Sequence, residues 1–182
     1  GRQSSDSAGG FKNPTGLDET LYASALESCR IVDDMVQWPD YDRTEVGERG
    51  ISVSGGQKAR ISLARAVYSD SDLYLLDDPL SAVDAHVGKA LFFDCIMGNL
   101  RGRGKGVVLA THQLQYLKYA DKVIVLDSYG RQCMCGTYSE LQSRMSEFPY
   151  LNMSNNADES TGDSESGASV KEPARYDPQH LN

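Results

Sequence analysis

The order of apolar and polar residues divides the chain into helical, extended and patternless segments. Apolar residues recur at helical spacing in these runs: Leu17–Cys29, the residues after Gln57, Asp84–Met97 and Tyr138–Met145. Short apolar runs typical of strands are Leu73–Leu76, Gly106–Thr111, Lys122–Leu126 and Arg131–Gly136, with a short helix around Leu114–Leu117. Because strands and helices alternate, the sequence predicts an α/β fold built from parallel β-α units.

Local signals predict where some of these elements begin and turn. The first helix has Asp18 and Glu19 in its first turn, where the helix dipole favours acids. Its apolar face is predicted to comprise Leu21, Ala25, Leu26 and Cys29. Thr137, followed three residues later by Glu140, has the spacing of a capping box for the last helix. A turn at Tyr129-Gly130 joins the last two predicted strands.

The two ends of the chain lack any apolar period. Residues 1–16 are rich in Gly, Ser and Asp, which predicts a loop or a frayed end. Residues 152–182 are rich in Ser, Asn, Asp and Glu and hold almost no large apolar side chains. This composition predicts a disordered acidic linker.

The first candidate for ligand chemistry is the segment Ser54-Gly55-Gly56-Gln57, which stands directly before an amphipathic run. Two glycines at a helix start let an anion approach the backbone closely. The free N–H groups and the positive end of the dipole then favour phosphate. The ordinary alternative is that Ser-Gly-Gly forms a linker or a turn.

The second candidate is the pair Asp77-Asp78, which ends the apolar run Leu73–Leu76. That run is short enough for a buried parallel strand. Open α/β sheets place ligands at the carboxyl ends of such strands, where one carboxylate can hold Mg²⁺ and the other can orient a water. The alternative is that the two aspartates only end the strand.

Taken together, these motifs resemble the ATP-binding cassette (ABC) family. Ser54–Gln57 is similar to its signature motif and Leu73–Asp78 to its Walker B strand. Ser81–Asp84 is similar to its D-loop, and His112, after the Gly106–Thr111 strand, to its switch histidine. All of them stand in the family's order along the chain.

The resemblance implies ATP and Mg²⁺ as ligands, with a role for each matching residue. Asp77 is implied as the magnesium ligand, and Asp78 and His112 as catalytic residues. The residues implied to contact nucleotide are Ser54, Gly55, Gly56, Gln57 and Asp84. The activity implied is that of a transporter ATPase, which couples ATP binding and hydrolysis to export.

One part of a complete cassette is not found in the sequence. A phosphate-cradling loop reads G-x-x-x-x-G-K-[ST], but Gly104-Lys105 is followed by glycine and Gly88-Lys89 by alanine. The resemblance therefore implies the C-terminal part of a nucleotide-binding domain, inactive by itself. Residues 17–69 are expected to form part of the helical subdomain with the signature, and residues 70–151 the C-terminal part of the α/β ATPase core.

The segment Leu75–Val87 narrows the resemblance to the first nucleotide-binding domain of multidrug-resistance-associated (subfamily C) exporters. Thr44–Gly50 is similar to a segment that contacts the transmembrane domains in exporters, although a plain connecting loop fits it too. The implied partners are a second nucleotide-binding domain and the transmembrane domains of the same transporter. This chain is then expected at the cytoplasmic face of a membrane.

Two positions depart from the family pattern. Val53 stands where the signature normally begins with leucine, and its packing should survive because both residues are apolar. Asp78 stands where most active cassettes have glutamate, and a displacement of ~1 Å can lower a rate by about 100-fold. The chain's own Walker B site is therefore expected to hydrolyse weakly, whereas its signature would complete the ATP site of the partner domain.

Composition limits the remaining classes of function. The net charge of −8 disfavours a nucleic-acid-binding surface. No apolar run reaches the ~18–20 residues of a membrane span, so contact with a membrane is expected only through the missing transmembrane domains. The cysteines lack the spacing of a metal site and are expected to be reduced, partly buried thiols: Cys29, Cys95, Cys133 and Cys135.

Two other functions compete with export. Soluble cassettes of DNA repair or translation share these motifs, but they usually carry glutamate at the position of Asp78. A regulatory or gating module that binds nucleotide without hydrolysing it remains open, because Asp78 weakens hydrolysis.

Overall fold

The computed structural model describes residues 16–47 and 50–148, which form two compact units divided between Ala110 and Thr111. The loop predicted at residues 1–16, Gly16 excepted, lies outside the described residues. The linker predicted at residues 152–182 does too. Each unit is described by itself.

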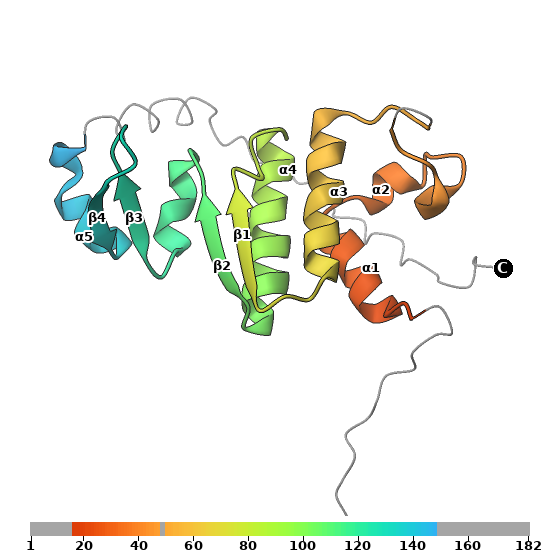
Figure 1. Ribbon diagram of the computed structural model, residues 1–182, viewed down its shortest axis with the longest axis horizontal. Helices are drawn as coiled ribbons and strands as arrows, with labels where there is room; N and C mark the ends of the chain where they lie inside the picture. Colours follow the sequence, from red (N-terminus) through yellow and green to blue (C-terminus); the bar gives the residue numbers. More distant parts are fainter. Residues whose placement is uncertain (1–15, 48–49, 149–182) are drawn as a thin grey trace, which may run out of the picture. The chain divides into compact units, whose positions relative to one another are not determined.

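The first unit contains the parallel strand pair and the helices that precede and connect its two strands (Figure 1). Its elements are α1 (Glu19–Ser28), α2 (Val32–Met35), η1 (Tyr41–Arg43), α3 (Gly55–Tyr68), β1 (Leu73–Asp77), α4 (Ala85–Ala90), η2 (Leu91–Leu100), η3 (Arg101–Arg103) and β2 (Gly106–Ala110). The helix predicted from Asp84 to Met97 therefore exists, but it changes from α to π geometry at Leu91.

The start of α1 follows from its acidic first turn. The Asp18 carboxylate accepts a hydrogen bond from the Leu21 N–H and caps the helix. Of the predicted apolar face, Ala25, Leu26 and Cys29 are buried, whereas Leu21 is only half-buried.

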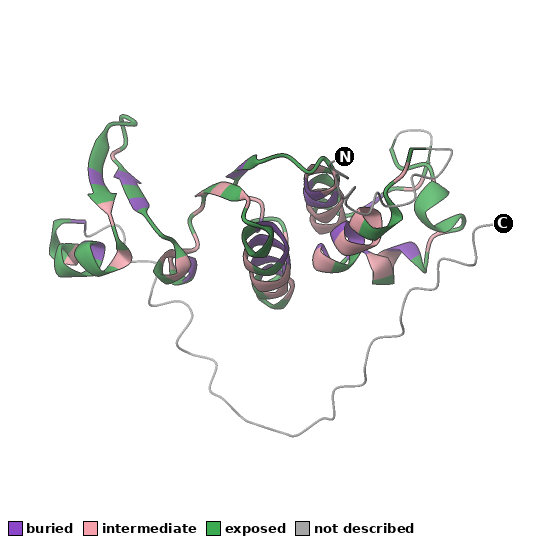
Figure 2. Ribbon diagram, turned by 90° about the horizontal axis from the view of Figure 1, so that it is seen from below, coloured by how far each residue is buried: buried purple, intermediate pink, exposed green. Residues whose placement is uncertain are grey.

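The strands β1 and β2 pair in parallel, as predicted, with Leu73 opposite Gly106 and Asp77 opposite Ala110. The two carboxyl ends therefore lie at the same edge. The expectation that β1 is buried was wrong for one of its faces, because Leu73 and Leu75 are 57% and 74% exposed. The helix that begins with α4 lies on one side of the pair (Figure 2), and no described element of the first unit covers the other.

The helices of the first unit pack around a small apolar cluster. Its buried members are Leu26, Ile31 and Met35, and Tyr22, Val32, Trp38 and Ile61 pack against them. The thiols of Cys29 and Cys95 lie buried at 3.6 Å from each other, without a disulfide. The hydrogen bond with Cys95, together with burial, raises the pKa of Cys29, which keeps this thiol protonated.

The second unit is an antiparallel hairpin with short helices. Its elements are η4 (Leu114–Tyr119), β3 (Val123–Leu126), β4 (Gln132–Gly136), α5 (Tyr138–Ser143) and η5 (Met145–Glu147). The alternation of strands and helices predicted parallel β-α units, but β3 and β4 are joined by the predicted turn, which is too short for a crossover, and they pair antiparallel. The predicted turn is confirmed by Gly130, whose φ is +76°.

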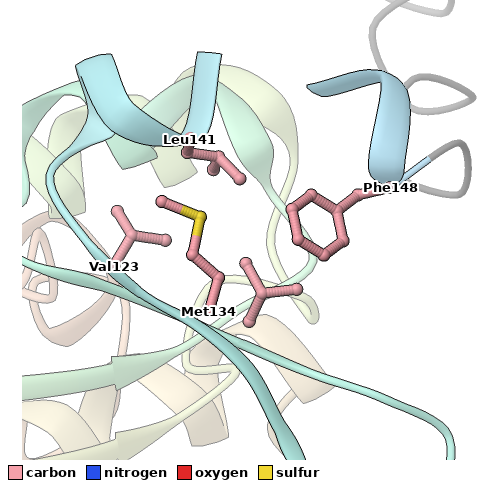
Figure 3. Packing of buried hydrophobic residues seen from close by; sticks show 5 residues of the cluster. Val123, Met134, Leu141 and Phe148 are labelled. Carbon is pink, nitrogen blue, oxygen red and sulfur yellow. The ribbon is translucent and has the colours of Figure 1, made fainter. Parts of the chain in front are cut away.

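The core of the second unit lies between the hairpin and α5 (Figure 3). Its buried members are Val123, Val125, Met134, Leu141 and Phe148. The cysteines of β4, Cys133 and Cys135, are exposed and free of disulfides. In the described part of both units, no helix is long and apolar enough to cross a bilayer.

Candidate functional site

The helix α3 begins with a closed pair of side-chain hydrogen bonds. Ser54 Oγ accepts from the Gln57 N–H at 3.1 Å, and Gln57 Oε1 accepts from the Ser54 N–H at 2.8 Å. This capping box fixes the first turn. The N–H groups of Gly55 and Gly56, at the positive end of a 14-residue helix, have no intrahelical partner by helix geometry.

The two glycines of this turn differ in their surroundings. A Cβ on Gly55 would meet nothing within 4 Å, so this position faces open space. A Cβ on Gly56 would lie 3.1 Å from the Ala82 carbonyl oxygen and 3.4 Å from Val83 Cγ1. Gly56 therefore allows the start of α3 to approach the Ser81–Asp84 segment closely.

A cleft of about 330 Å³ lies between these two segments. The first turn of α3 and Arg60 line one side, and residues 82–84 with Val87 line the other. The structure thus brings together all the predicted nucleotide contacts, which are Ser54, Gly55, Gly56 and Asp84, with Gln57 in the same turn. Val53, directly before this turn, is buried, as expected for an apolar replacement.

Asp84 caps the helix that follows the cleft. Its Oδ1 accepts from the Val87 N–H at 2.9 Å, at the start of α4. This backbone hydrogen bond lowers the pKa of the Asp84 carboxyl and keeps it ionised. The carboxylate is therefore a fixed part of the wall, and the nucleotide contact implied for it stays a prediction.

The aspartates at the carboxyl end of β1 have unequal environments. Asp77 is exposed, whereas Asp78 adopts a left-handed backbone conformation with φ of +43°. The Asp78 N–H donates to the Ala110 carbonyl at 2.8 Å, which ties it to the end of β2. Asp78 Oδ1 is buried without a hydrogen-bond partner in the described part of the chain. Such strain and an unsatisfied acceptor are typical of functional sites.

His112 belongs to the second unit, is exposed, and follows the last residue of β2 by two positions. The catalytic role implied for it stays a prediction. Within residues 16–47 and 50–148, no three His, Cys, Asp or Glu side chains gather as metal ligands. A Mg²⁺ ion bound through one carboxylate and substrate phosphates needs no such group, so Asp77 stays a predicted ligand.

The sequence did not reveal the residues behind the α3 turn. Gln57 Nε2 donates to Asp34 Oδ1 at 2.7 Å, and Arg60 Nη1 lies 2.5 Å from Asp34 Oδ2. The side chains of Asp34 and Arg60 are only 17% and 14% exposed. The one available signal was the spacing of Gln57 and Arg60, which puts both on the same face of a helix.

Comparison with known proteins places the chain near one family of transporters. The model of the ABC transporter family matches residues 11–81. ABC transporter C family member 12 of Dictyostelium discoideum is 50% identical over 145 residues, which cover 80% of this chain and 11% of that protein. Putative ABC transporter C family member 15 of Arabidopsis thaliana is 46% identical over 130 residues, or 71% of this chain and 12% of that protein. The chain spans about a tenth of the length of these curated relatives.

Proposed function

This chain belongs to the ABC transporter family, and we propose that it is the C-terminal part of a nucleotide-binding domain in a subfamily C exporter. The observation that carries the proposal is the cleft between the start of α3 and the Ser81–Asp84 segment. In the proposed assignment, residues 17–69 are part of the helical subdomain and residues 70–151 belong to the ATPase core. The whole transporter couples ATP binding and hydrolysis to export.

The start of α3 is suited to cap a nucleotide that the partner domain holds. The N–H groups of Gly55 and Gly56 supply donors without a side chain in front of them. Ser54 Oγ uses a lone pair to accept from Gln57, which leaves its hydroxyl proton to donate to a phosphate oxygen. The Gln57 amide is neutral, so it does not repel the phosphate.

The end of β1 is suited to the chemistry of the chain's own ATP site. The exposed Asp77 carboxylate fits a Mg²⁺ ion that is shared with phosphates. The unpartnered Oδ1 of Asp78 fits a polar ligand such as the attacking water. His112 would contact the γ-phosphate. Aspartate is one methylene shorter than glutamate, so hydrolysis at this site is proposed to be weak.

The remaining parts of the transporter are proposed to come from outside this sequence. They are the phosphate loop of this domain, the second nucleotide-binding domain and the transmembrane domains. The chain then works at the cytoplasmic face of a membrane. By itself it should bind ATP negligibly, because the signature adds only part of the contacts of a nucleotide held elsewhere.

The capping role is tested with Gly56→Asp in the intact protein that carries this chain. The new carboxylate would meet both the Ala82 carbonyl and the phosphate, so ATP-driven closure of the two domains and transport should be lost. Expression and nucleotide binding at the partner's phosphate loop should stay unchanged, and the melting temperature should fall no further than in Gly56→Ala, which brings the same Cβ against the Ala82 carbonyl. Normal transport by a well-folded Gly56→Asp variant contradicts the capping role.

The hydrolytic role is tested with Asp78→Glu, and it separates an ATPase from a non-hydrolysing regulatory module. Turnover is measured at this site alone, with the partner's site disabled. Restoring the longer carboxylate should raise turnover, whereas the matched change Asp77→Glu should lower it by displacing the metal ligand. Flat or reduced turnover in Asp78→Glu favours the regulatory module.

A further inference from the structure

We propose that Asp34 is a positioning residue that sets the orientation of the signature amide and thereby the geometry of the anion-binding start of α3. The inference rests on the proposed capping function of Ser54–Gln57. Asp34 itself does not line the cleft and lies on α2, 23 positions before Gln57.

Asp34 uses each carboxylate oxygen for a different partner. Its Oδ1 accepts from Gln57 Nε2 at 2.7 Å, and its Oδ2 accepts from Arg60 Nη1 at 2.5 Å. The Gln57 amide then presents its oxygen to the Ser54 N–H at 2.8 Å. These contacts form one continuous chain from Arg60 through Asp34 and Gln57 to the cap of α3.

The donor-to-acceptor direction of these hydrogen bonds depends on the charge of Asp34. A carboxylate can only accept hydrogen bonds, so the Gln57 amide has to turn its NH₂ group toward Asp34. Its oxygen then necessarily faces the Ser54 N–H. A group at position 34 that could also donate would permit the opposite orientation, in which the NH₂ of Gln57 faces the Ser54 N–H and the capping box is lost.

The carboxylate is held firmly enough to impose this orientation. Its neighbours Ile31 and Met35 are buried in the cluster against which Ile61 of α3 packs. Arg60 Nη1 also donates to the Arg30 carbonyl. Arg30 has a left-handed backbone with φ of +53°, and its Nε donates to Asp94 at 3.0 Å. A strained residue persists only where several contacts determine it, so the platform behind the turn is rigid.

The network also keeps negative charge away from the phosphate. Asp34 is paired with Arg60, so the region behind the turn is neutral as a whole. Arg60 lines the cleft and its Nε is buried without a hydrogen-bond partner in the described part of the chain. The charge-assisted contact to Asp34 therefore holds the guanidinium in place beside the anion site.

The test is Asp34→Asn, which keeps the size of the side chain, against Asp33→Asn as the matched control. The asparagine oxygen should stay with the charged Arg60, which turns its NH₂ toward Gln57 and reverses the signature amide. Asp33 is the exposed neighbour on the same helix, outside the network. Both variants are made in the intact protein that carries this chain.

Two readouts are measured, namely ATP turnover at the site that this signature caps and amide hydrogen exchange of residues 54–58. Asp34→Asn should lower turnover by about tenfold and raise exchange by about tenfold, the scale of losing one helix cap. Asp33→Asn should change neither. In a Gln57→Ala background, Asp34→Asn should lower turnover by less than about twofold more, because Asp34 acts through Gln57.

Three results would overturn the positioning role of Asp34. Unchanged turnover in Asp34→Asn, with turnover abolished by Gly56→Asp, overturns the positioning role and leaves the capping role intact. Losses that simply multiply in the double variant also overturn it, because they indicate a structural role independent of Gln57. Unchanged turnover in Gly56→Asp overturns the capping role and the inference with it.

Discussion

The helices α3 and α5 start with the same hydrogen-bond pattern, yet only α3 is suited to hold an anion. At α3, Ser54 and Gln57 bond reciprocally to each other's backbone N–H groups. At α5, Thr137 and Glu140 do the same, with the Thr137 N–H 2.6 Å from Glu140 Oε2. The capping box therefore starts a helix and by itself makes no binding site.

The difference lies in charge and in what covers the first turn. Glu140 places its own carboxylate at the positive end of α5, so the helix already carries its anion. Hydrogen bonds from the Thr137 N–H, the larger cause, and from the Thr137 hydroxyl lower the pKa of the Glu140 carboxyl. Gln57 is neutral, and Gly55 and Gly56 leave the backbone bare where α5 has Tyr138 and Ser139.

The largest effect is expected when the start of α3 is made like that of α5. Gln57→Glu would place a carboxylate oxygen 2.7 Å from Asp34 Oδ1, where an N–H donor now stands, and next to the phosphate. Repulsion on both sides should lower ATP turnover at the capped site by on the order of 100-fold. Turnover is measured in the intact protein, with Glu140→Gln as the control that should leave it unchanged. Turnover within a factor of about two of the wild type would mean that neutrality at this position is not required.

A smaller effect should separate the two glycines of α3. Gly55→Ala meets open space and should raise the free energy of unfolding by about 0.5–1 kcal/mol through helix propensity. In Gly56→Ala the new Cβ presses on the Ala82 carbonyl, so the free energy of unfolding should fall by about 1 kcal/mol. Urea unfolding of the chain measures both, and Ser139→Ala on α5 serves as a control. Equal shifts for the two glycines would contradict the close contact with the Ser81–Asp84 segment.

The predictions that held from the sequence were those that depend on neighbouring residues. The capping box of α5, the turn at Gly130 and the acidic start of α1 each need only a few residues in a row. The same rule, Ser-x-x-Gln, also fits Ser54–Gln57, although these residues were interpreted only as a phosphate motif.

The features that the sequence missed depend on elements far apart in the chain. The exposed face of β1 cannot be read from Leu73–Leu76, because an apolar strand has the same residues whether or not another layer covers it. The antiparallel pairing of β3 with β4 follows from the length of their connection, which the rule of alternating elements ignores. The contact between Asp34 and Gln57 joins residues 23 positions apart, and the helical spacing of Gln57 and Arg60 does not identify Asp34 as their partner.

Removing the hydroxyl of either helix cap should lower the free energy of unfolding by about the same amount, whereas only one of the two changes should affect ATP turnover. Ser54→Ala and Thr137→Ala each remove the side chain that accepts from the third helical N–H. Each should lower the free energy of unfolding by about 1 kcal/mol. Only Ser54→Ala should also reduce ATP turnover, because only its hydroxyl is proposed to reach a phosphate. An equal loss of turnover in Thr137→Ala would remove the distinction between the two helix starts.

The smallest effect is expected in the pH dependence of stability, because of the two caps only that of α5 contains a titrating group. The folded-state pKa of Glu140 is lowered from its ordinary value of 4.5. Its contribution to stability is therefore fully present above pH 4.5 and is lost as the pH falls through the lowered value. Wild type should be more stable than Glu140→Gln at pH 7, and the difference should shrink as the pH falls below 4.5. Urea unfolding across the acid range measures this difference, and Ser139→Ala should leave the pH profile unchanged. A gap between wild type and Glu140→Gln that stayed constant into acid would mean that the Thr137 N–H gains nothing from the charge of Glu140. The two helix starts would then differ only in their glycines.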